Sequence, residues 1–121
     1  MTEIKSAKRY DLEDRTLEFA KRVRAFVKKL SKTIGNIEDG KQLVRASGSV
    51  GANYIEANEA FSKKDFLMRA KICRKEVKES RYWLKLVEIQ TVFELEKERD
   101  SLIVEATELM NIFGAIIRKS E

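Results

Sequence analysis

The chain has 121 residues, of which 43% are hydrophobic and 37% charged, a composition typical of one globular helical domain and not of a disordered chain. Its net charge of +5 gives it a general attraction to polyanions such as nucleic acid. Histidine is absent, which excludes Ser-His-Asp and Cys-His catalysis, the usual zinc sites and histidine-ligated di-iron centres.

The cellular location is predicted from cysteine content and hydropathy. The single cysteine, Cys73, cannot form an internal disulfide, and no secretory leader pattern opens the sequence. No run approaches the roughly eighteen consecutive apolar residues of a membrane-spanning helix. We therefore expect a cytoplasmic protein with no membrane partner.

The first helix is predicted over about residues 14–32. Gly35 and Asn36 are expected to end it in a left-handed turn, followed by a short loop to about Ile37. Its apolar residues recur at steps of three and four, as on one face of a helix: Leu17, Ala20, Val23, Phe26, Val27, Leu30 and Ile34.

The second helix is predicted over about residues 38–60, with two glycines, Gly48 and Gly51, near its middle. Each glycine lowers helix propensity by about 1 kcal/mol relative to alanine, so we expect another backbone to approach closely there. A loop over residues 48–51 is the competing interpretation. The expected core face consists of Leu43, Ala46, Ser47, Val50, Tyr54 and Ala57.

The third and fourth helices are predicted over about residues 63–91 and 99–119. Ser62 is the expected N-cap of the third helix, and a loop is expected around residues 94–99. The third helix has the clearest apolar seam: Phe66, Ala70, Cys73, Val77, Ser80, Leu84 and Val87, widened by Ile72, Trp83 and Leu86. The fourth helix repeats the rhythm at Leu102, Ala106, Leu109, Phe113 and Ile116.

Short connections between four helices predict antiparallel neighbours. We therefore expect an all-α fold, an up-down-up-down four-helix bundle that forms a single domain over residues 1–121. One bundle is not expected to cover Phe93, Ile103 and Ile117, which indicates association with further copies. Cys73 lies on the core seam, where a small, buried and unreactive thiol is expected.

Three pairs of glutamates lie three residues apart, Glu56 with Glu59, Glu76 with Glu79, and Glu105 with Glu108. Each pair lies on one side of a helix, and several pairs facing one cleft could hold Mg²⁺, as in the all-α nucleotide pyrophosphohydrolases. The alternative is that the pairs are solvated by-products of a chain rich in Glu and Lys.

A row of cations follows the core seam of the third helix one position later: Lys71, Arg74, Lys78, Arg81 and Lys85. This row, which we call the basic face, predicts salt-dependent and sequence-independent binding of RNA or DNA, with Tyr82 near enough to stack on a base. A solvated helix surface is the competing interpretation.

Two segments carry a family resemblance. Residues 45–57 read RASGSVGANYIEA, and residues 75–84 read KEVKESRYWL. At this separation they resemble the four-helix-bundle proteins encoded in intervening sequences of bacterial 23S ribosomal RNA genes. The resemblance implies a cytoplasmic ring, typically a homopentamer, with no established enzymatic activity. A similar fold occurs in the accessory protein of diversity-generating retroelements, a basic pentamer that associates with nucleic acid.

The matching residues include a polar set beside the core seam: Asn53, Glu56, Arg69, Glu76 and Trp83. We expect Glu56 or Glu76 to pair with Arg69 and Asn53 to bond across to the third helix, which would fix the register of the bundle.

From the residues and the resemblance together we expect a non-enzymatic, oligomeric protein that binds nucleic acid and needs neither metal nor cofactor. A Mg²⁺-dependent nucleotide pyrophosphohydrolase and a purely structural ring are the alternatives.

Overall fold

The computed structural model describes the backbone of residues 2–90 and 92–121, and the side chains of residues 12–90 and 92–121. It contains four helices: α1 (Thr2–Lys28), α2 (Ile34–Asn58), α3 (Lys63–Leu86) and α4 (Phe93–Ser120). No strand occurs in the described residues. The predicted all-α four-helix bundle is confirmed. No helix within the described part of the chain is both long and apolar enough to cross a bilayer.

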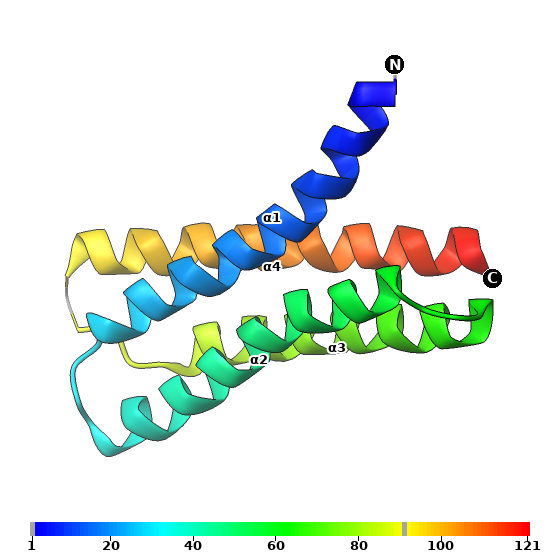
Figure 1. Cartoon of the computed structure of the whole chain (residues 1–121). Helices are drawn as coiled ribbons and strands as arrows, with labels where there is room; N and C mark the ends of the chain where they lie inside the picture. The colour runs from blue at the N-terminus through cyan, green and yellow to red at the C-terminus, as the bar shows by residue number, and fades with distance from the viewer. Residues whose placement is uncertain (1, 91) are drawn as a thin grey trace.

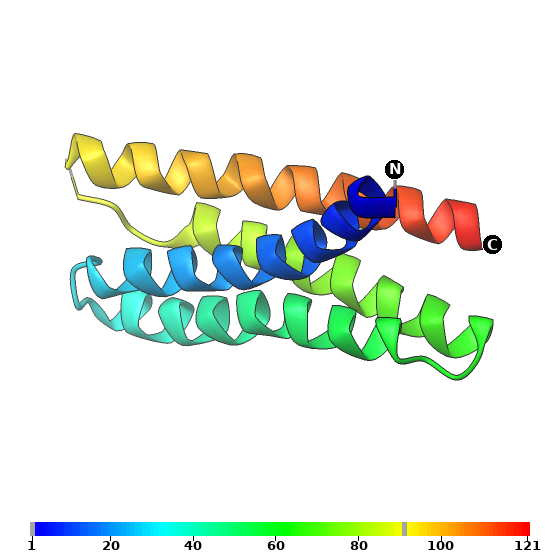
Figure 2. The ribbon, with the colours of Figure 1, turned by 45° about the horizontal axis from the view of Figure 1, so that its top comes forward.

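Each helix runs antiparallel to the one before it, and α1 closes the bundle by packing on both α2 and α4 (Figure 1). The N-terminal part of α1 points away from the other three helices in Figure 1 and crosses in front of α4 in Figure 2. Among the described side chains of α1, that of Leu12 is the first that is buried in the core.

The interior is built from the positions that the apolar rhythm predicts. All six residues of the expected α2 face are buried, as are the α3 seam residues from Ala70 to Val87, while Phe66 is half-buried. In α4, Leu102, Ala106 and Leu109 are fully buried. The predicted periodicity therefore identifies the core faces of α2, α3 and the centre of α4.

Predictions of burial fail at the margins of the bundle. Leu17, Ile34 and Leu86 are exposed although the pattern assigned them to the core. Near the middle of α1 the interior is instead reached by Thr16 and Phe19, each one position before a predicted residue, whereas Val23, Phe26 and Leu30 are buried as predicted. Ile117 is buried within the single chain, which corrects the expectation that one bundle leaves it uncovered, whereas Ile103 is half-buried.

The boundary between α1 and α2 differs from prediction, because Gly35 and Asn36 begin α2 and do not end α1. Thr33 is the N-cap, and its hydroxyl accepts from the amide of Asn36 at 3.1 Å. The buried Asn36 side chain donates to the carbonyl oxygens of Ser31 and Glu88 and accepts from the amide of Glu88. One amide side chain thus joins the α1–α2 loop to the end of α3.

The same contact explains the early end of α3, at Leu86 and not near residue 91. Val87 is buried in an extended conformation and Glu88 is held by Asn36, so the chain leaves the helix there. Helix α4 then starts at Phe93, six residues before the prediction, with Glu94 and Glu96 favourably placed in its first turn. The predicted Ser62 cap is confirmed, since its hydroxyl accepts from the amide of Asp65 at 3.0 Å.

The two glycines in the middle of α2 differ in what surrounds them. The segment is helical, so the competing loop over residues 48–51 is wrong. A Cβ on Gly51 would lie 3.0 Å from the hydroxyl oxygen of Thr16 and 3.8 Å from its carbonyl carbon, which confirms the expected close approach of another backbone and identifies it as that of α1. A Cβ on Gly48 would meet nothing within 4 Å, so close approach does not explain that glycine.

This difference predicts opposite outcomes for two identical substitutions. Gly48→Ala should raise the free energy of unfolding by about 0.5–1 kcal/mol, because alanine favours the helix and fits without contact. Gly51→Ala should give no gain or a loss of about 1 kcal/mol, since the buried Thr16 side chain must move to admit the methyl group. Urea unfolding of both variants measures the difference; an equal gain in both would contradict the close packing at Gly51.

Candidate functional site

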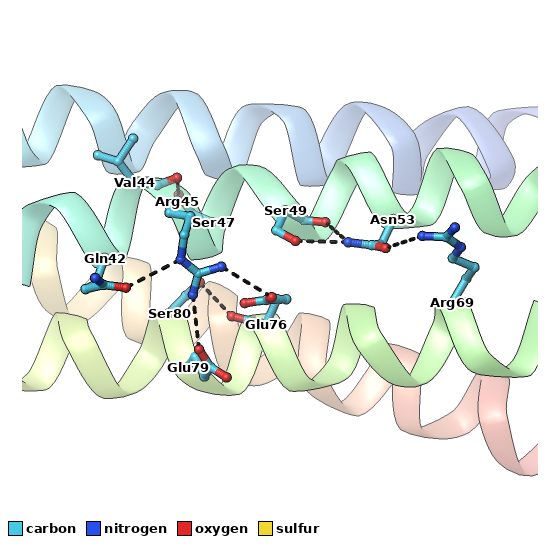
Figure 3. A network of polar contacts seen from close by, with 10 residues as sticks. All are labelled: Gln42, Val44, Arg45, Ser47, Ser49, Asn53, Arg69, Glu76, Glu79 and Ser80. Carbon is cyan, nitrogen blue, oxygen red and sulfur yellow. Dashed lines mark hydrogen bonds and ion pairs between the residues drawn. The ribbon is translucent and has the colours of Figure 1, made fainter.

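The polar side chains between α2 and α3 form two separate groups along the helices (Figure 3). In the first, Arg45 of α2 reaches Glu79 at 3.3 Å and the buried Glu76 at 3.6 Å, both on α3. It also donates to Gln42 on its own helix at 3.4 Å. Arg45 therefore holds both carboxylates of one glutamate pair.

The second group contains Arg69 of α3, which donates from Nη1 to the side-chain oxygen of Asn53 at 3.0 Å. The amide nitrogen of Asn53 donates in turn to the carbonyl and hydroxyl oxygens of Ser49, one turn earlier on α2. Asn53 thus bonds across to α3 as expected. The expected glutamate partner of Arg69 is wrong, because Arg45 binds Glu76 and Glu56 is exposed to solvent.

Trp83 takes no part in either hydrogen-bonded group. Its ring packs edge-on against Tyr82, with centroids 5.0 Å apart. Among the side chains of residues 12–90 and 92–121, its buried Nε1 has no hydrogen-bond partner, and neither has Oε1 of Glu76. The five residues of the predicted polar set therefore do not form one network.

A second glutamate pair is held by an arginine in the same way. Arg15 of α1 donates to both carboxylate oxygens of Glu105, at 2.7 and 2.8 Å, and to Glu108 at 2.7 Å, both on α4. The hydrogen bond to Glu105 is the main cause that raises the pKa of Arg15 above its ordinary value, against partial desolvation. Two of the three pairs considered for Mg²⁺ thus join neighbouring helices through arginine.

The acidic side chains and the cysteine do not gather into a metal-binding cluster in the described part of the chain. Within residues 12–90 and 92–121, no three or more Cys, Asp or Glu side chains are grouped so that they could hold a metal ion. Cys73 is fully buried and its thiol donates to the carbonyl oxygen of Val50 at 3.4 Å. Burial raises the pKa of this thiol to about 12, so it stays protonated and a poor nucleophile at neutral pH.

The basic face lies on α3, where four of its five members are exposed and Arg81 is half-buried. Arg81 donates to the hydroxyl of Thr107 on α4 at 3.2 Å, which directs it toward the bundle. Within the described side chains, no carboxylate lies within ion-pair distance of the other four. Their charges are available to an external anion.

Five cations line a groove between α3 and α4, which we call the α3–α4 groove and which has a volume of about 620 Å³. Lys71, Arg74, Lys75 and Lys78 line its α3 side, and Gly114, Ile117 and Arg118 line its α4 side, with Glu121 at its end. Sequence reasoning missed Lys75, Gly114 and Arg118. The (i, i+4) spacing of Lys71 and Lys75 was visible, but nothing in the sequence placed Arg118 opposite Arg74.

The fold and the site together define a class: an all-α antiparallel bundle in which arginines hold glutamate pairs, and in which one face of α3 carries cations without carboxylate partners among the described side chains. The family model of the 23S rRNA-intervening sequence protein matches residues 8–115. The chain belongs to this family, and the resemblance noted from residues 45–57 and 75–84 is confirmed.

A solved structure supports the same assignment. It is a protein of unknown function from the S23 ribosomal protein family of Bacteroides thetaiotaomicron, 34% identical to this chain, with a TM-score of 0.76. The match covers 88% of this chain and 97% of that one. No protein with a curated description matches the chain.

Proposed function

We propose that this protein is a non-enzymatic, cytoplasmic binding protein that forms a homo-oligomer and binds RNA or DNA through the basic face of α3. The observation that carries the proposal is the set of four exposed cations, Lys71, Arg74, Lys78 and Lys85, without carboxylate partners in the described side chains. A row of this kind recognises the phosphate backbone and not the bases, so affinity should depend on salt and little on sequence.

The proposal predicts a strong salt effect on binding. With about four phosphate contacts, the Kd for a fluorescently labelled single-stranded RNA should rise roughly 50-fold between about 50 and 200 mM salt. Fluorescence anisotropy measures this dependence. An affinity that does not change with salt would contradict the phosphate model.

A charge-matched pair of variants separates the basic face from net charge. Replacing Lys71, Arg74, Lys78 and Lys85 by glutamine should abolish measurable binding at moderate salt. The control replaces four exposed lysines that lie away from α3, Lys28, Lys32, Lys41 and Lys97, and should retain most of the affinity. Equal losses in the two variants would show that only total charge matters.

The oligomer is supported by a groove of about 480 Å³ between α1 and α2, which is lined by Ala20 and Ala52 together with the exposed Leu17 and Ile55. In keeping with the family resemblance we propose a homopentamer. Light scattering should then give a mass about five times that of the 14.0 kDa chain. A monomeric mass at micromolar concentration would contradict this part of the proposal.

A further inference from the structure

We propose that the α3–α4 groove binds a phosphate group between the guanidinium groups of Arg74 and Arg118. This inference rests on the proposed function, since it names the part of the basic surface that holds a phosphate most tightly. It adds a residue from α4 that lies outside the basic face.

Gly114 lines the groove, and the side chains of both arginines lie close to it. A Cβ built on this glycine would lie 3.4 Å from Nη1 of Arg118 and 3.9 Å from Nε of Arg74. Both guanidinium groups therefore approach one point on the surface of α4. Two donors this close can bind one phosphate group, because each guanidinium presents several N–H groups in a planar fork.

The groove is electrostatically suited to an anion. Lys71, Lys75 and Lys78 surround the arginines, and Glu121 is the one carboxylate that lines the described groove. No carboxylate in the described side chains lies within ion-pair distance of Arg74 or Arg118. Like charges held this close repel each other, and a bound phosphate would relieve that repulsion.

The other two residues of the basic face, Arg81 and Lys85, are less well placed to bind a phosphate in the groove. Arg81 already donates to Thr107, and Lys85 stands exposed about 21 Å along α3 from Lys71. Neither lines the groove. The structure therefore predicts unequal contributions from cations that look equivalent in the sequence.

The test compares two double variants that each remove two positive charges. Arg74→Gln with Arg118→Gln should raise the Kd for single-stranded RNA about tenfold or more at moderate salt. The control variant, Arg81→Gln with Lys85→Gln, removes the same number of charges from the basic face of α3. It should raise the Kd less than about threefold. If RNA binds with salt dependence but both variants lose affinity equally, the groove inference is overturned and the proposed function stands.

A second variant blocks the groove without changing charge. Gly114→Leu places a side chain where the two guanidinium groups lie, and the Cβ that it adds meets only the side chains of Arg118 and Arg74 within 4 Å. Its affinity for RNA should fall about as far as that of the arginine double variant, while its circular dichroism spectrum stays that of a folded helical bundle. Affinity equal to that of the wild type would overturn the inference.

A comparison with inorganic tripolyphosphate shows whether the groove binds the phosphates of a nucleic acid or a free polyphosphate. If it raises the melting temperature of the wild type but not of the arginine double variant, while RNA shows no salt-dependent binding, the groove binds free polyphosphate and the proposed function fails. If neither tripolyphosphate nor RNA distinguishes the double variant from the wild type, the inference is overturned.

Discussion

Replacing Phe113 with alanine is expected to lower the free energy of unfolding by about 4 kcal/mol. Phe113 of α4 is fully buried, and its ring meets that of Tyr54 from α2 edge-to-face, with centroids 5.8 Å apart. Alanine removes both the buried apolar surface and the aromatic contact and leaves a cavity that the surrounding helices can fill only in part.

Urea unfolding at a fixed protein concentration measures the loss, because association would make the apparent stability depend on concentration. Phe93→Ala is the matched control on the same helix. Phe93 is 77% exposed, and its loss should change the monomer's stability by less than about 0.5 kcal/mol. A small effect at Phe113 would contradict the burial of α4 in a shared core.

Replacing Arg15 with methionine should lower the free energy of unfolding by about 2 kcal/mol. Arg15 binds both oxygens of Glu105 and one of Glu108, and the Glu105 side chain is only 16% exposed. Methionine keeps much of the aliphatic stem but leaves the Glu105 carboxylate without its partner. The packing of α1 on α4 should weaken most, so protection from hydrogen exchange should fall first in α1.

A double-mutant cycle with Glu105→Gln isolates the interaction, and we expect a coupling energy of about 1–2 kcal/mol. The control is Lys41→Met, which breaks an exposed pair with Glu38 within α2 and should cost less than about 0.5 kcal/mol. Equal costs at Arg15 and Lys41 would contradict a stabilising role for the bidentate contact.

These ion pairs change how the acidic residues of this chain are interpreted. A pair of glutamates three residues apart suits a metal site and an interhelical ion pair equally well in sequence. The structure distinguishes the two uses at Glu76 with Glu79 and at Glu105 with Glu108, where an arginine from the adjacent helix binds both carboxylates. An arginine beside these carboxylates places a positive charge next to any metal ion that they would hold, which lowers the affinity of the pair for a metal.

The predictable part of the candidate site is the part that lies on one helix. The cations of the basic face share one side of α3 because their spacing follows the helical repeat, which is a local property. Arg118 was not predicted, because its position opposite Arg74 depends on the axial register of α4 against α3. Gly114 was missed for the same reason, since its role depends on side chains from two helices.

The sequence alone determined the number of helices, the class of fold and the core faces of α2 and α3, because burial on one side of a helix imposes a repeat of three and four residues. Tertiary structure decided where the helices end and which residues meet. Asn36 shows why: no local signal reveals that its amide will bind Glu88, yet this contact holds the chain where α3 ends. The fold class is thus encoded in the periodicity of apolar residues. The ends of the helices and the α3–α4 groove depend instead on contacts between segments that are distant in the chain.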